Sequence, residues 1–223
     1  MTTSRADAAH VRASTQLPFA SCYVFSPTGG GPISVHSRRL RDHVKSAEQS
    51  WIALCAARVS RQCQPGAGLE GFFHAADVLV PLPGRKAGAV SREAVTRQLA
   101  ERLMESGLGC SVWAGLARIV EVPKSATAPR GARPDLERQF ESLGVVCAEG
   151  RGSVAQFMLI DDVVSRGRTM LAAAMRLREA FPRSRVRGFA LLRTLGMTAD
   201  VDRLLHPCIG TIRLARGDAR REP

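Results

Sequence analysis

The sequence predicts an α/β fold with a mostly parallel central sheet and helices on both faces. Short apolar runs alternate with segments of helical periodicity from residue 77 onward. Residues 157–160 are apolar at every position, as a strand buried on both faces requires. Because parallel strands need crossover helices between them, this alternation favours a parallel sheet.

Two elements precede the alternating part. Residues 19–25 fit a strand, and residues 36–58 fit a helix with a basic first half. The Pro- and Gly-rich turn between them lacks the Gly-Lys-Ser/Thr continuation of a phosphate-binding loop. A second break at residues 64–68 predicts a boundary. We therefore expect an N-terminal appendage or hood-like segment, residues 1–68, and a main domain, residues 69–223.

The main domain contains alternating strands and helices. The clearest helix covers residues 91–106, where Val95, Leu99 and Leu103 recur at every fourth position and form a core-facing stripe. A loop rich in positive charge, residues 123–133, follows later in the chain. The other expected elements are strands at 77–80, within 110–122, at 157–160, at 186–192 and at 209–214, and helices at 134–143 and 169–181.

Composition limits the classes of function. No apolar run approaches the roughly 18 residues that a membrane helix needs, and the first 20 residues lack the apolar core of a secretion signal. We therefore expect a cytoplasmic protein with no membrane partner. The formal net charge of +12 attracts anions, whether phosphates or nucleic acid. The six cysteines form no C-x-x-C pair, which argues against a zinc ribbon.

The candidate site follows the apolar strand at 157–160. Two acids, Asp161 and Asp162, come first, and a short loop with Gly167 at its centre then leads into a helix. Glycine allows close approach of the backbone to an anion, and the amides at a helix start point toward it. Carboxylates accept hydrogen bonds from vicinal hydroxyls. The segment therefore suits a sugar phosphate bound beyond the carboxyl end of a strand.

Residues 157–169 resemble the 5-phosphoribosyl-1-pyrophosphate (PRPP) motif of type I phosphoribosyltransferases. The motif consists of four apolar residues, two acids, two apolar residues, a small residue, a permissive position, glycine, any residue and a hydroxyl. Residues 76–85 (Ala-Asp-Val-Leu-Val-Pro-Leu-Pro-Gly-Arg) are similar to the strand and pyrophosphate loop of the ComF-like group. The resemblance spans roughly residues 70–195. It departs from the family at Ser165-Arg166-Gly167, where Thr-Thr-Gly or Thr-Gly-Gly is usual.

The resemblance implies a type I phosphoribosyltransferase fold and a set of site residues. The acids Asp161 and Asp162 would bind the ribose hydroxyls, and Lys124 lies in the loop that often closes over the family's site. These three are the candidate catalytic residues. The PRPP-binding residues would be Asp161, Asp162, Val163, Val164, Ser165, Arg166, Gly167, Arg168 and Thr169. The pyrophosphate loop would be Leu82, Pro83, Gly84 and Arg85.

The implied activity is transfer of a 5-phosphoribosyl group from PRPP to a small-molecule acceptor, with release of pyrophosphate. Mg²⁺ would be bound mainly through PRPP, with no direct protein ligand assigned. The alternative is a non-catalytic PRPP-sensing regulator or a ComF-like nucleic-acid-associated factor. Only weak nucleic-acid binding is expected, because no helix-turn-helix pattern accompanies the positive charge. The oligomeric state stays open, with a homodimer among the options.

Overall fold

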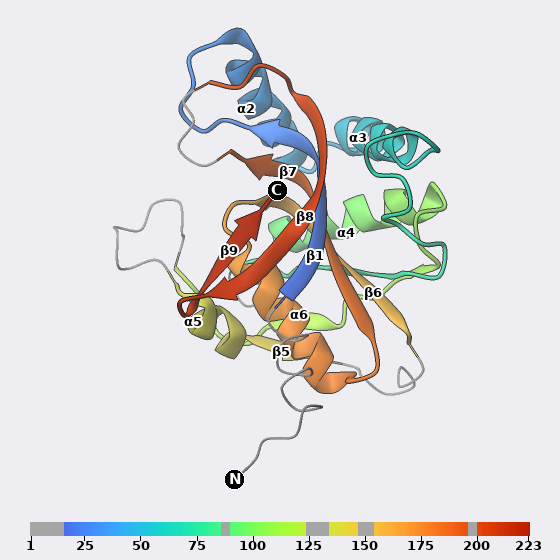
Figure 1. Cartoon of the computed structure of the whole chain (residues 1–223), viewed down its shortest axis with the longest axis vertical. Helices are drawn as coiled ribbons and strands as arrows, with labels where there is room; N and C mark the ends of the chain where they lie inside the picture. Colours follow the sequence, from blue (N-terminus) through green and yellow to red (C-terminus); the bar gives the residue numbers. More distant parts are fainter. Residues whose placement is uncertain (1–15, 86–89, 124–133, 147–153, 196–199) are drawn as a thin grey trace.

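The computed structural model describes residues 16–85, 90–123, 134–146, 154–195 and 200–223. Within these residues, seven strands form one mixed sheet in the order β3-β2-β6-β7-β1-β8-β9 (Figure 1). The first five strands in this order run parallel, whereas β8 and β9 are antiparallel to their neighbours. The expected α/β class with a mostly parallel sheet is therefore confirmed.

The elements of this sheet and its surroundings have the following bounds. The sheet strands are β1 (Gln16–Phe25), β2 (Val78–Pro81), β3 (Ser111–Val112), β6 (Gln156–Val164), β7 (Arg185–Thr194), β8 (Leu205–Ala215) and β9 (Asp218–Glu222). A small second sheet pairs β4 (Leu116–Arg118) with β5 (Leu143–Val145). The helices are α2 (Pro32–Lys45), α3 (Gln49–Gln62), α4 (Val90–Glu105), α5 (Leu136–Glu141) and α6 (Arg168–Ala180).

Apolar cores lie on both faces of the sheet, as expected. One core contains Leu171 and Leu177 of α6, and the other contains residues from α2, α3 and α4. The strand residues of β6 divide between them, since Phe157 and Leu159 belong to the first core and Met158 and Ile160 to the second. All four are fully buried, which explains the unbroken apolar run in the sequence.

The first described strand belongs to the main sheet. Strand β1 lies between β7 and β8, with Phe19 opposite Gly188 on one side and Gly210 on the other. Residues 16–25, which the sequence assigned to the N-terminal segment 1–68, therefore share one sheet with the strands of residues 69–223. The pairing joins positions that are far apart in the chain, so local sequence patterns carry no sign of it.

Several elements differ from the expected ones. The single helix expected at 36–58 is two helices, because the Ser46 hydroxyl donates to His43 O (2.8 Å) and Ala47 adopts a left-handed conformation with φ 59°. The strand expected within 110–122 is two short strands in different sheets. Strand β6 continues past Ile160 to Val164, and β9 was not expected.

Among the described residues, no helix is both long enough and apolar enough to cross a membrane.

Candidate functional site

The two loops that resemble PRPP-binding loops lie at the same edge of the sheet. Strands β2 and β6 are parallel neighbours, with Pro81 opposite Ile160. The Leu82 amide still donates to Ile160 O (2.9 Å), after which the chain of residues 82–85 leaves the sheet. Strand β6 continues from Asp161 to Val164 and then turns into α6. Both loops therefore follow the carboxyl ends of adjacent parallel strands, where α/β sheets bind ligands.

Gly167 shapes the turn from β6 into α6. It is the N-cap of α6 and has φ 86° and ψ 11°, a left-handed conformation that glycine adopts without the strain of a side chain. A β carbon there would lie 2.6 Å from Ile212 Cδ1, so the strand β8 packs tightly against the turn. The first-turn amides of a helix have no intrahelical acceptor, and α6 has no acidic residue in its first turn. This geometry suits an anion at the start of α6.

The two acids are buried near the end of β6. Asp161 is 4% exposed and Asp162 is 1% exposed. Asp161 Oδ1 accepts a hydrogen bond from the Asp162 amide, and Asp162 Oδ1 accepts one from the Val163 amide, both at 2.9 Å. The strand was expected to end at these acids, but it continues to Val164, and Asp161 lies opposite Ala190 within the ladder. The continued pairing therefore fixes the backbone positions of both carboxylates.

The loop at 82–85 is held by its carbonyl groups. Leu82 O accepts from Thr96 Oγ1 of α4 (3.0 Å), Gly84 O accepts from Arg118 Nε (3.0 Å), and Arg85 O accepts from the Val122 amide (3.2 Å). In a trans peptide the C=O and the following N–H point in opposite directions. The Arg85 amide therefore points away from Arg118. Together with the half-buried Arg85 side chain, this amide can donate hydrogen bonds to an anion.

A buried polar network connects the two loops. Arg118 of β4 is 6% exposed and donates to Gly84 O, to Gln139 Oε1 (3.2 Å) and to Ser142 Oγ. Gln139 Oε1 also accepts from Thr169 Oγ1 (3.4 Å) in the first turn of α6. A continuous path of hydrogen bonds thus runs from Gly84 to Thr169. Nothing in the sequence distinguished Arg118 as a site residue, because its burial depends on the small sheet of β4 and β5.

Arg168 is bound to a strand that the sequence did not predict. Its guanidinium donates to both carboxylate oxygens of Asp218 in β9 (2.6 and 2.5 Å) and to Pro134 O (3.1 Å). These hydrogen bonds hold the pKa of the Asp218 carboxyl below its usual range and raise the pKa of Arg168. The Arg168 side chain therefore pins β9 to the start of α6. The more exposed Arg166 lies 3.5 Å from Asp218.

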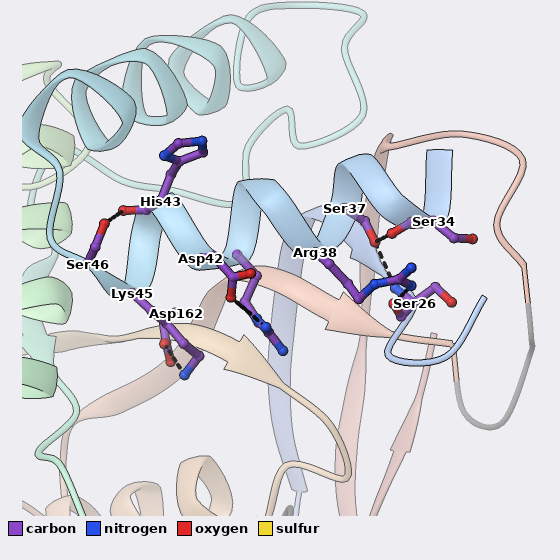
Figure 2. A network of polar contacts seen from close by, with 10 residues as sticks. Ser26, Ser34, Ser37, Arg38, Asp42, His43, Lys45, Ser46 and Asp162 are labelled. Carbon is purple, nitrogen blue, oxygen red and sulfur yellow. Dashed lines mark hydrogen bonds and ion pairs between the residues drawn. The ribbon is translucent and has the colours of Figure 1, made fainter. Parts of the chain in front are cut away.

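Lys45 places a cation beside the buried acids. It is the last residue of α2, and its Nζ lies 3.0 Å from Asp162 Oδ2 (Figure 2). The other end of α2 is fixed by Asp200, whose Oδ1 accepts from the Gly31 amide (2.7 Å) and from Ser34 Oγ (2.9 Å). Those bonds hold the pKa of the Asp200 carboxyl below its usual range. Lys45 was missed because it lies outside the segment that carries the resemblance.

The remaining candidate residues differ in their exposure to solvent. Ser165 is exposed, Val163 is half-buried and Val164 is buried. Lys124 lies outside the described residues. Within the described ranges, no group of three or more His, Cys, Asp or Glu side chains is arranged to hold a metal ion. The site therefore offers amides, guanidinium groups and two carboxylates, a set suited to a phosphorylated polyol.

Comparisons with known proteins found no matching family model and no matching curated protein.

Proposed function

We propose that the chain has a type I phosphoribosyltransferase fold and transfers a 5-phosphoribosyl group from PRPP to a nitrogen acceptor. The observation that carries this proposal is that the 82–85 loop and the 165–169 loop follow adjacent parallel strands, with Asp161 and Asp162 beside them. PRPP has phosphate groups on both sides of a ribose. Its shape therefore fits two phosphate loops that flank a pair of carboxylates.

In the proposed complex, each part of PRPP has its own partners. Asp161 and Asp162 accept hydrogen bonds from the ribose hydroxyls, and the loop from Ser165 to Thr169 binds the 5-phosphate with backbone amides. Residues 82–85 bind the pyrophosphate, with the Arg85 amide and guanidinium as donors. Mg²⁺ fits this set of oxygen donors, because it keeps most of its waters and uses ligand phosphates; when bound, it would neutralise the leaving pyrophosphate.

Catalysis would rest on position and charge. A nitrogen lone pair of the acceptor forms the C1–N bond while the C1–O bond breaks, and its electron pair leaves on pyrophosphate. The nitrogen then loses its proton to the pyrophosphate or to water. Carboxylates that hold the ribose stabilise the oxocarbenium-like charge at C1, and cations at the loop neutralise the leaving group. The acceptor itself is defined here only as a nitrogen nucleophile.

Lys45 adds a feature to this proposal. With PRPP bound, the Asp162 carboxylate accepts a hydrogen bond from a ribose hydroxyl, either together with Lys45 or in its place. The lysine compensates the charge of a carboxylate that is almost fully buried, which otherwise carries a large desolvation cost. Both oxygens of a carboxylate accept hydrogen bonds, as binding to ribose hydroxyls requires.

The test is pyrophosphate release from PRPP and Mg²⁺ against a panel of bases and amines, with an Asp162→Asn variant beside the native chain. We expect this variant to bind PRPP at least about tenfold more weakly, because a charged acceptor is lost. Asparagine keeps an acceptor for the Val163 amide, and the half-exposed Lys45 can be hydrated, so the variant should remain folded.

Asp202→Asn is the matched control, since the Asp202 side chain is 77% exposed and its partner is the adjacent Arg203. PRPP affinity should be unchanged in this control. Unchanged affinity in a folded Asp162→Asn variant would contradict the assignment. PRPP binding without release of pyrophosphate for any acceptor would contradict the transferase and favour the PRPP-sensing regulator.

A further inference from the structure

Two arginines outside the resembling motifs lie close to the start of α6. Arg193 is near the end of β7, directly opposite Val164 of β6, and is 2% exposed. Arg221 lies in β9, opposite Ile212 of β8, and is half-buried. Both come from the last 31 residues of the chain.

The hydrogen bonds of both arginines go to neutral groups. Arg193 Nη1 donates to Ser21 Oγ (3.1 Å) and His206 O (2.5 Å), and Arg221 Nη2 donates to Thr194 O. Arg193 Nε and Arg221 Nη1 are buried and have no hydrogen-bond partner among the described residues. Nor does either guanidinium form an ion pair with an acid in those parts of the chain that the structure describes.

One buried and one half-buried guanidinium without a carboxylate are costly for the fold, although Arg221 also lies over the Phe19 ring at 5.7 Å. Burial lowers the pKa of both arginines, and for Arg221 the charge of Arg193 lowers it further, to about 10. Arginine keeps its proton in proteins at neutral pH, so both side chains carry a positive charge. An unpaired buried charge carries a desolvation cost that an anion in hydrogen-bonding contact offsets. Two neighbouring side chains carry this desolvation cost, which indicates that an anion is their missing partner.

The pair of arginines lies beside the glycine loop that precedes α6. Val164, opposite Arg193, is followed directly by the exposed Ser165 of the glycine loop. Ile212, opposite Arg221, packs against Gly167 itself, where a β carbon would lie 2.6 Å from its Cδ1. The two arginines therefore approach the loop from β7 and from the C-terminal hairpin of β8 and β9.

We propose that Arg193 and Arg221 form a dibasic site for a phosphate monoester group, next to the amides of the 165–169 loop. A phosphate dianion matches two positive charges, and the free Nε and Nη1 donors suit its oxygens. Arg221 is half-buried and Ser165 is exposed, so the proposed site borders solvent. The identification of this phosphate as the 5-phosphate of PRPP rests on the proposed function. The existence of an oxyanion site at the two arginines does not depend on that function.

The experiment measures binding of inorganic phosphate and ribose 5-phosphate to the full chain by calorimetry at constant ionic strength. The variant is Arg221→Gln. The matched control is Arg220→Gln, because this neighbour in β9 has a side chain that is 68% exposed and its removal changes the net charge equally. We expect Arg221→Gln to lower the affinity for both ligands at least about tenfold, and Arg220→Gln to lower it less than about twofold.

A second variant, Arg221→Lys, guards against a folding defect in Arg221→Gln. Lysine keeps the charge but loses the fork of the guanidinium, so its phosphate affinity should fall between those of the native chain and Arg221→Gln. Equal phosphate affinity in the variants at positions 220 and 221 would overturn the site and leave the two arginines as structural ties of the hairpin. The same conclusion would follow if the native chain bound no phosphate.

The two proposals fail in different ways. If the native chain binds phosphate through Arg221 but does not bind PRPP with Mg²⁺, the proposed function fails and the dibasic site stands. If PRPP binds equally well to the native chain and to the variants at position 221, the dibasic site fails and the proposed function stands.

Discussion

Replacing Gly167 with alanine is expected to reduce PRPP affinity at least about a hundredfold and to destabilise the fold by about 2–4 kcal/mol. The left-handed backbone at φ 86° costs a residue with a side chain about 1–2 kcal/mol. The new β carbon would also lie 2.6 Å from Ile212 Cδ1, so the loop or β8 must shift. Either shift moves the amides that we assign to the phosphate.

Gly71→Ala is the matched control for this variant. Gly71 also has a positive φ, 69°, but a β carbon there meets nothing within 4 Å. The control therefore carries the backbone strain alone, about 1–2 kcal/mol. Urea unfolding compares the two stabilities, and PRPP titration compares the affinities. Native PRPP affinity in a folded Gly167→Ala variant would contradict a phosphate site at this turn.

Replacing Arg118 with methionine is expected to lower the free energy of unfolding by about 2–4 kcal/mol and to weaken pyrophosphate binding. Arg118 is buried, and its loss would leave Gly84 O and Gln139 Oε1 without a strong donor. Each buried polar group left unsatisfied costs about 1–3 kcal/mol. Without this anchor the Gly84–Arg85 peptide can rotate, so the Arg85 amide loses its direction.

Arg138→Met is the control for Arg118→Met, since Arg138 is an exposed arginine one helical turn before Ser142. The stability and the pyrophosphate affinity of the Arg138→Met variant should stay close to those of the native chain. Denaturant unfolding and calorimetry with pyrophosphate check both quantities. If Arg118→Met loses stability but binds pyrophosphate normally, then Arg118 supports only the packing of β4, and our account of the 82–85 loop is wrong.

The sequence predicted the local elements of the fold better than their arrangement. The apolar run at 157–160 and the stripe of Val95, Leu99 and Leu103 follow directly from burial, so the strand and the helix were found. The neighbours of β1 depend instead on pairing across the chain, as between Phe19 and Gly188. No periodic pattern records such a contact.

Strand β9 was missed for a different reason. Its residues, Asp-Ala-Arg-Arg-Glu, contain no apolar run, because the strand lies at the edge of the sheet. The turn before it does carry a signal. Arg216 and Gly217 both have positive φ, 52° and 76°, and a residue followed by glycine is typical of a two-residue hairpin turn. That dipeptide was the available indication of the hairpin.

The candidate site was predictable where its chemistry is local. Gly167 and the paired acids stand in one short segment, so their spacing alone indicated a phosphate loop. Lys45, Arg118 and Asp218 reach the site from α2, β4 and β9. Their roles depend on the order of the strands, which places distant segments around one edge of the sheet. The sequence contains 32 Lys and Arg residues, and no local pattern distinguishes those that reach the site from the others.

The central claim, that one PRPP molecule spans both loops, is tested most directly by competition calorimetry. PRPP with Mg²⁺ is titrated into the full chain alone, then in the presence of pyrophosphate, and then in the presence of ribose 5-phosphate. We expect PRPP to bind more tightly than either fragment, and each fragment to weaken PRPP binding competitively. Absence of PRPP binding, or a fragment that leaves PRPP affinity unchanged while it is itself bound, would contradict the claim.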